Sequence, residues 1–271
     1  MSSISTADFS LLLWVMAALV AMFASYLFMG WTRRAQAHES WREWLAPIVL
    51  AGSSLGVGLS SAMVLALSAE GLRFALGYRW LALPFLVLGP TLACMLVAWW
   101  LSRRQNWLVL LGSGLLLAAI GVAVQSGWIS SAGLRPGLRW QFGWLGAAAA
   151  IAAVGQAAAL WLAYSDASND AARKTLWRVG AAALMALTVI AGQELVGTAA
   201  GLGTQVSSLY LREASATWVS LIAGAVVPTV MAMMALDLTL RNRADRARRR
   251  RGSFEPNLQP RRKRRRKYRA I

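Results

Sequence analysis

The polar side chains best suited to chemistry lie in two dipeptides, Gln125-Ser126 and Gln193-Glu194, each inside a long apolar run. The amides and the hydroxyl can donate and accept hydrogen bonds, and the carboxyl of Glu194 can hold a charge or a proton. Polar groups are costly inside a membrane, so they are retained there for binding or for pairing with one another. We therefore expect these four residues to line a small polar pocket that binds a ligand.

Glu194 allows two interpretations at this stage. It lies near one end of its apolar run, where a carboxylate can reach the water around the lipid headgroups. Alternatively, the carboxyl is protonated and hydrogen-bonded to Gln125 across the bundle, because an uncompensated charge in lipid is expensive. Both interpretations remain open from the sequence.

Catalytic chemistry is not expected. The chain has one cysteine, Cys94, and one histidine, His38. Zinc hydrolases, haem bundles with paired histidines and histidine-relay pumps all need more of these side chains. The sequence also suggests no nucleophile beside a base and no paired carboxylates. We expect a non-enzymatic protein without a metal or another cofactor.

Seven apolar stretches must position the polar residues. The chain is 58% hydrophobic and 14% charged, whereas soluble domains carry more charge. A membrane-spanning helix needs roughly 20 mostly apolar residues, and barrel strands would be shorter and alternating. The sequence therefore predicts an all-α, polytopic protein, with a membrane domain over 1–240 and a tail over 241–271. The predicted transmembrane helices are 9–31, 45–68, 80–101, 107–130, 141–164, 176–200 and 217–240.

A repeated turn divides these helices into a leader and three pairs. The turns read Ser68-Ala69-Glu70-Gly71-Leu72-Arg73, Ser131-Ala132-Gly133-Leu134-Arg135 and Thr198-Ala199-Ala200-Gly201-Leu202. Each turn follows one apolar stretch and precedes another. The repeat therefore places Gln125-Ser126 and Gln193-Glu194 at matching heights in the predicted bundle.

Basic residues set the predicted orientation, because cytoplasmic loops carry an excess of Lys and Arg. Residues 241–271 contain 15 Lys and Arg against two acidic residues. We therefore expect a cytoplasmic tail. With seven crossings, the N-terminus then lies on the outer, periplasmic side.

The layout resembles the MHYT domain, a bacterial seven-helix membrane sensor module that repeats a Met-His-Tyr-Thr signature. The likeness is clearest in the third repeat, where the family reads roughly Ala-Gly-Met-His-Tyr-Thr-Gly-Met-Ala-Ala. This chain has Ala191-Gly192-Gln193-Glu194-Leu195-Val196-Gly197-Thr198-Ala199-Ala200. The small residues of the frame are kept and the four signature residues differ. Ala24-Ser25-Tyr26 and Gly56-Val57-Gly58-Leu59-Ser60 also resemble the family.

The resemblance bears on metal binding. MHYT proteins are proposed to sense oxygen, carbon monoxide or nitric oxide through copper held by the signature Met and His. The His positions correspond here to Met63 or Val64, Ser126 and Glu194, and the Met positions to Ala62, Gln125 and Gln193. Thioether and imidazole are the ligands that favour copper. The comparison therefore implies a sensor scaffold that lacks the copper ligands.

The tail is predicted to be disordered because it cannot bury a core. Its basic blocks are Arg248-Arg249-Arg250-Arg251 and Arg261-Arg262-Lys263-Arg264-Arg265-Arg266-Lys267. Each Arg near an anionic leaflet contributes about 1 kcal/mol, so anionic lipid headgroups are the favoured partner. Nucleic acid is the alternative, because basic clusters neutralise phosphates. Just before the tail, the spacing of Asp237 and Arg241 predicts a helical ion pair.

The favoured function is a non-enzymatic, sensor-like protein of the bacterial inner membrane that binds a ligand or partner in its bundle. MHYT proteins often end in domains that make or hydrolyse cyclic dinucleotides, and residues 241–271 are too few for such a domain. The resemblance therefore implies a cytoplasmic partner protein. Two alternatives remain open: a small-molecule transporter or channel, and a membrane anchor whose basic tail is the working part. The sequence leaves the oligomeric state unknown.

Overall fold

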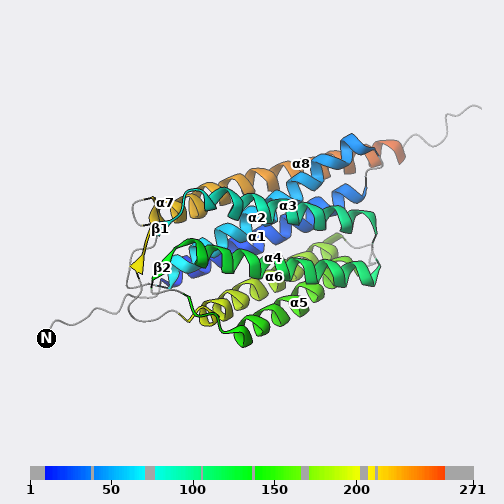
Figure 1. The fold of residues 1–271 in the computed structure, drawn as a ribbon. Helices are drawn as coiled ribbons and strands as arrows, with labels where there is room; N and C mark the ends of the chain where they lie inside the picture. Colours follow the sequence, from blue (N-terminus) through cyan, green and yellow to red (C-terminus); the bar gives the residue numbers. More distant parts are fainter. Residues whose placement is uncertain are drawn as a thin grey trace, which may run out of the picture. The chain divides into compact units, whose positions relative to one another are not determined.

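Helices make up almost all of the described structure (Figure 1). This computed structural model describes residues 10–37, 40–70, 77–104, 106–135, 138–165, 171–201, 207–210 and 213–253. The helices are α1 (Leu11–Gln36), α2 (Trp41–Ala69), α3 (Ala82–Arg103), α4 (Trp107–Ser131), α5 (Phe142–Tyr164), α6 (Ala171–Ala199), α7 (Ala216–Leu221), the π-helix η1 (Ile222–Val226) and α8 (Val227–Ser253). Seven helical segments among the described residues are long and apolar enough to cross a membrane. The predicted all-α fold with seven spans is therefore confirmed.

The seventh span contains a change of helix type. α7, η1 and α8 follow one another directly, and the N–H of Val227 donates to the carbonyl of Ile222 in the wider π pattern. Pro228 follows, and a proline has no N–H to donate to the preceding turn. The single π turn accommodates this missing donor within one continuous helix.

Helix ends follow the capping residues of the sequence. Side-chain oxygens accept a hydrogen bond from the backbone N–H three residues later at the starts of α1, α2, α4 and α7, from Ser10, Ser40, Asn106 and Ser215. After α4 and α6, Gly133 and Gly201 have φ angles of +57° and +56°. Glycine adopts this left-handed conformation without a steric penalty and ends helices in this way. The Gly-Leu turns of the second and third repeats are thus helix-terminating turns.

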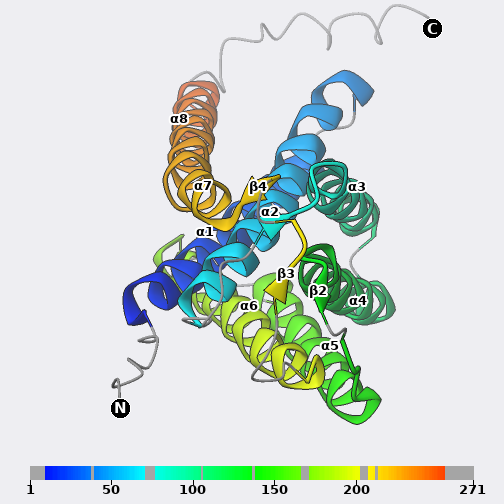
Figure 2. The ribbon, with the colours of Figure 1, turned by 60° about the vertical axis from the view of Figure 1, so that its left-hand side comes forward.

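The turns that follow α2, α4 and α6 meet at one end of the bundle, which we call the turn end (Figure 2). Two short antiparallel pairs form there: β1 (Gly77–Tyr78) with β4 (Ala214–Ser215), and β2 (Leu134–Arg135) with β3 (Ser207–Ser208). The Ser208 hydroxyl donates to the carbonyl of Ala132 at 2.7 Å and accepts from the N–H of Gly77 at 3.2 Å. One buried serine therefore joins the turns of all three repeats.

The interior of residues 10–232 is built around α2. The apolar window of α2 is 78% buried, compared with 28% for α3 and 33% for α5. α1 packs along both α2 and α6, α3 lies on α2, and α5 lies between α4 and α6. Polar residues on the inner faces of α2, α4 and α6 at the turn end are consequently enclosed by protein.

Glycines bring α2 close to α3. A Cβ on Gly56 would lie 2.4 Å from the Cα of Thr91, whereas a Cβ on Gly89 of α3 would meet nothing within 4 Å. Gly56→Ala is expected to lower the free energy of unfolding by about 1–3 kcal/mol, because overpacking forces the two helices apart. Gly89→Ala is the matched control and should leave thermal unfolding in detergent nearly unchanged. Equal melting temperatures for the two variants would contradict this packing.

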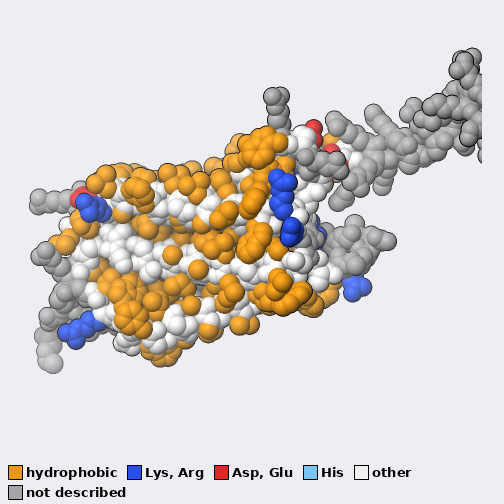
Figure 3. Space-filling view, turned by 45° about the vertical axis from the view of Figure 1, so that its right-hand side comes forward, with side chains coloured by type: hydrophobic (Ala, Val, Ile, Leu, Met, Phe, Trp, Pro, Cys, Tyr) orange, Lys and Arg blue, Asp and Glu red, His pale blue; other side chains and the backbone are white. Residues whose placement is uncertain are grey.

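The outer surface of these helices is apolar. Figure 3 shows hydrophobic side chains spread along the visible face, with Lys and Arg toward its ends. Phe85, Leu92 and Val154 are 77%, 64% and 73% exposed. Large exposed apolar side chains over the length of a helix are the expected surface of a protein solvated by lipid.

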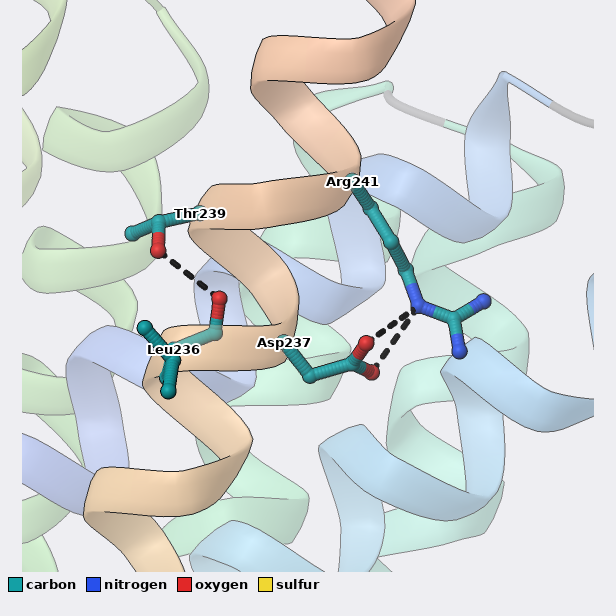
Figure 4. Close-up of polar contacts among 4 residues, drawn as sticks. All are labelled: Leu236, Asp237, Thr239 and Arg241. Atoms are coloured by element: carbon teal, nitrogen blue, oxygen red, sulfur yellow. Dashed lines mark hydrogen bonds and ion pairs between the residues drawn. The ribbon is translucent and has the colours of Figure 1, made fainter.

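Residues 233–271 form a second unit. Within it, Nε of Arg241 lies 2.7 and 2.9 Å from the two carboxylate oxygens of Asp237 (Figure 4). The hydroxyl of Thr239 donates to the carbonyl of Leu236 on the same helix. The predicted ion pair is therefore confirmed, and because both side chains are exposed it contributes only a few tenths of a kcal/mol.

The helix also corrects one prediction about the tail. α8 continues to Ser253, so residues 241–253 are helical where disorder was predicted. Arg and Ala are strong helix formers, and the preceding span supplies the nucleus that a free peptide would lack. The side chains of Arg248–Arg251 and all residues from 254 onward, including the second basic block, lie outside the described part.

Candidate functional site

Two of the four predicted site residues are buried glutamines on facing helices. Gln125 of α4 and Gln193 of α6 are each 4% exposed. The amide nitrogen Nε2 of Gln125 donates to the carbonyl of Val189 on α6 at 3.2 Å. Within the described residues, Oε1 of Gln125 and both amide atoms of Gln193 have no hydrogen-bond partner. Buried polar atoms are almost always paired, so these three atoms are candidates for binding a ligand or water.

A glycine lets Gln125 approach the backbone of α6. A Cβ on Gly192 would lie 3.6 Å from Nε2 and 3.7 Å from Oε1 of Gln125. The amide of Gln125 therefore packs on the backbone of α6 at Gly192, the residue that precedes Gln193. Ser126 does not join them, since its hydroxyl donates at 2.8 Å to the carbonyl of Val122 within its own helix.

Glu194 points to another neighbour. Its side chain is exposed, and its Oε1 accepts a hydrogen bond from Nε1 of Trp14 on α1 at 3.1 Å. Among the described residues, no hydrogen bond joins Glu194 to Gln125. Of the two interpretations left open by the sequence, the structure therefore has the accessible carboxyl and not the cross-bundle bond.

The residue that sequence reasoning missed is Glu70. It caps the C-terminal end of α2 and is partly buried. A Cβ on Gly197 of α6 would lie 3.5 Å from its Oε1, which places this carboxyl beside the turn of α6 that follows Glu194. Burial, and then the negative charge of Glu194, raise the pKa of Glu70 from 4.5 to about 7. This second carboxyl beside α6 was not anticipated from the sequence.

A signal for Glu70 was present in the repeat. The first turn reads Ser68-Ala69-Glu70-Gly71, and the second reads Ser131-Ala132-Gly133. Glu70 is thus an additional acidic residue inserted where the second repeat has none. Its partner could not be read from the sequence, because α2 and α6 meet only through the tertiary fold.

Two aromatic residues complete the site. Tyr78 is fully buried, and its ring meets that of Trp128 edge-on at a centroid distance of 5.1 Å. Within the described residues, neither the Tyr78 hydroxyl nor Nε1 of Trp128 has a hydrogen-bond partner. Burial, and then the charge of Glu70, raise the pKa of Tyr78. The hydroxyl therefore lies within electrostatic range of the Glu70 carboxyl.

Seven residues from α1, α4, α6, β1 and the C-terminal cap of α2 lie near the turn end, and we call them the turn-end cluster. Its members are Trp14, Glu70, Tyr78, Gln125, Trp128, Gln193 and Glu194. The cluster offers carboxylates, amides, a phenol and indole N–H groups, which suit polar or protonated ligands. Groups of three or more His, Cys, Asp or Glu that could hold a metal do not occur among the described residues. His38 lies outside that part, and Cys94 is buried in α3.

Replacing Gln193 with leucine tests whether its amide stabilises the fold. Gln193→Leu removes two unpartnered polar atoms and keeps a similar volume, so we expect the free energy of unfolding to rise by about 1–2 kcal/mol. Gln125→Leu is the matched control, because it also loses the bond to Val189 and should gain less. Thermal unfolding of both variants measures the difference. If Gln193→Leu instead lowers the free energy of unfolding by more than Gln125→Leu does, the amide of Gln193 stabilises the fold and the prediction is wrong.

The opposite end of the bundle carries arginines stacked on aromatic rings. Arg33 lies 5.4 Å from the ring centre of Tyr164 and donates to the carbonyl of Ala163. Arg103 lies 4.7 Å from the ring of Trp44. Such cation–π contacts contribute about 0.5–2 kcal/mol and hold arginine heads at the depth of the lipid headgroups.

Two grooves open between helices near the turn end. One, of about 410 Å³, is lined by Arg79, Tyr210 and residues of α3 and α4. The other, of about 310 Å³, is lined by Trp80, Trp218 and apolar residues of α3, α7 and η1. Their lining includes only Trp128 of the turn-end cluster. Both grooves therefore lie beside the turn-end cluster and are not part of it.

Comparison with known proteins gives a partial match. The chain is similar to the bifunctional diguanylate cyclase/cyclic di-GMP phosphodiesterase MucR of Pseudomonas aeruginosa, with 30% identity over 192 residues that cover 67% of this chain and 26% of MucR. The chain thus spans about a quarter of the length of this relative. Searches against family models and against solved structures gave no match, so membership of the MHYT family is not confirmed.

Proposed function

We propose that the chain is a non-enzymatic sensor module of the bacterial inner membrane, which binds a ligand or partner at the turn-end cluster. The bundle then changes its helix packing and passes the signal to a partner on the other side. The turn end faces the outside of the cell in this proposal, and the basic tail lies in the cytoplasm against anionic lipid headgroups.

The observation that carries the proposal is the unpartnered amide of Gln193. It is 4% exposed in an apolar bundle, and the amide of Gln125 on the facing helix is only partly satisfied. Leaving a buried polar group unpaired costs about 1–3 kcal/mol. A ligand that supplies the missing hydrogen bonds recovers this free energy, and the bound and free states then differ in stability.

The orientation is supported by the distribution of arginines. Arg33, Arg103 and Arg178 lie at the end of the bundle opposite the turn end, where they stack on Trp and Tyr rings. Cytoplasmic ends of membrane proteins carry the excess of basic residues.

The similarity to MucR supports a place in cyclic di-GMP signalling. MucR both makes and degrades this dinucleotide according to its name, and the chain matches about a quarter of its length. We infer that the chain passes its signal to a protein that makes or degrades cyclic di-GMP. No catalytic role is assigned to the chain itself.

The test uses the full chain fused, after residue 271, to a diguanylate cyclase domain. The rate of cyclic di-GMP synthesis in isolated membranes is the readout. Gln193→Ala is expected to change this rate about fivefold or more, which corresponds to a coupling free energy of roughly 1 kcal/mol. Leu187→Ala, on the lipid-facing side of α6 with a 63% exposed side chain, is the control. Equal rates in the wild type and both variants would reject the sensor function.

A further inference from the structure

We propose that Glu70 and Glu194 form a proton-binding switch at the turn end, which makes the proton a signal that the bundle senses. This inference rests on the proposed sensor function and names its ligand. The two carboxyls share one proton when the ends of α2 and α6 are packed together. Loss of that proton places two negative charges between the ends of α2 and α6.

The geometry brings the two carboxyls together from different helices. Glu70 caps α2, and a Cβ on Gly197 of α6 would lie 3.5 Å from its Oε1. Glu194 lies one turn earlier on α6, and the hydrogen bond from Nε1 of Trp14 at 3.1 Å holds its Oε1. α1, α2 and α6 therefore all contribute to the pair.

The surroundings supply hydrogen bonds and no described counter-charge. α1 contributes Trp14, and β1 contributes Tyr78, whose fully buried hydroxyl has no partner within the described residues. α6 contributes the unpartnered amide of Gln193. Among the described residues, no Lys or Arg forms an ion pair with either carboxyl. A second negative charge there would be compensated only by polar groups.

The two carboxyls differ in environment, which separates their roles. Glu70 is partly buried, whereas Glu194 is exposed. Burial and the charge of Glu194 raise the pKa of Glu70 from 4.5 to about 7. A carboxyl in a low-dielectric site next to a second carboxyl is favoured in its protonated form.

A structural link connects the pair to the helices. The backbone N–H of Ser10 at the start of α1 donates to the carbonyl of Ala69 at 3.0 Å, directly before Glu70. Ionised Glu70 is repelled by Glu194, so the end of α2 is displaced from α6 and this bond is strained. Neutral Glu70 removes the repulsion. The protonation state thus biases the packing of three transmembrane helices.

Infrared titration of the full-length protein in lipid nanodiscs tests the switch directly. A protonated carboxyl has a carbonyl stretching band that a carboxylate lacks. In the wild type we expect one such band to disappear with a midpoint near pH 7, following the pKa of Glu70. Glu70→Gln should abolish this titration. Glu194→Gln should lower its midpoint only in part, because the repelling charge is gone while burial, the larger cause of the raised pKa, remains.

Glu213→Gln is the matched control. Glu213 also lies at the turn end and is exposed, but its carboxylate accepts from the backbone N–H of Trp80. The Glu213→Gln variant should leave the midpoint of the infrared titration unchanged. A wild-type protein without a carboxyl titrating near neutral pH, or a midpoint that Glu70→Gln does not affect, would overturn the switch. Because Gln resembles the protonated carboxyl in shape, these variants are expected to fold.

The infrared test of the proton switch does not depend on the cyclase-fusion test of the sensor function. The infrared measurement uses no reporter domain. A missing titration together with a cyclase fusion that responds to Gln193→Ala would reject the proton and keep the sensor. A clear titration with an unresponsive fusion would reject the sensor and keep the proton site.

Discussion

The protein is expected to lose thermal stability as the pH rises from about 5 to about 8, and Glu70→Gln is expected to remove that loss. The pKa of Glu70 is raised in the folded protein from 4.5 to about 7. A group with a raised pKa binds its proton more tightly when folded. Its stabilising contribution is therefore complete below pH 4.5 and is lost as the pH passes through about 7. The difference is on the order of 3 kcal/mol.

The measurement is a series of melting curves in nanodiscs at several pH values for the wild type, Glu70→Gln and the control Glu213→Gln. The control should follow the wild type. Glu70→Gln should be about as stable at pH 8 as the wild type is at pH 5. A wild-type stability that rises over this interval would contradict the sign of the argument, because it would mean that Glu70 is favoured in its ionised form.

Ser208→Ala is expected to lower the free energy of unfolding by about 3 kcal/mol. The Ser208 hydroxyl is 6% exposed, donates to the carbonyl of Ala132 and accepts from the N–H of Gly77. Alanine would leave both backbone groups buried without this partner. Because Gly77 belongs to the turn that carries Glu70, the variant should also weaken the link between the three repeats.

Hydrogen exchange gives the second readout for this variant. Amides of residues 77–78 and 132–135 should exchange faster in Ser208→Ala, while those in the middle of α2 keep their protection. Ser130→Ala, an exposed serine at the same end, is the matched control and should change neither quantity. Unchanged melting of Ser208→Ala would show that the repeats are held together elsewhere.

The fold was predictable because its main signal is local. Apolar runs of membrane length predict the helices directly, and glycines such as Gly133 and Gly201 mark where two of them end. The boundary between the last helix and the tail was less predictable. The helix continues through residues 241–253 because the span before it supplies the first turns, an effect that composition does not carry.

The site was predictable only in part, because its partners come from different helices. The repeat predicts Gln125 and Gln193 at matching heights, and the structure packs the amide of Gln125 on α6 at Gly192. It did not predict that Glu194 turns toward Trp14 of α1. The angular position of a side chain on its helix and the identity of the facing helix both decide such contacts. Glu70 was missed for the same reason.

The proposed direction of sensing requires that α6 crosses the membrane with the turn end outside. Thr198 and Arg173 are exposed residues near the two ends of this helix. In a Cys94→Ala background, which removes the single native cysteine, Thr198→Cys and Arg173→Cys differ only in their predicted side of the membrane. A membrane-impermeant maleimide added to intact cells is expected to label Thr198→Cys and to leave Arg173→Cys unlabelled until the cells are opened. Labelling of Arg173→Cys in intact cells, with Thr198→Cys protected, would contradict the proposed direction of sensing.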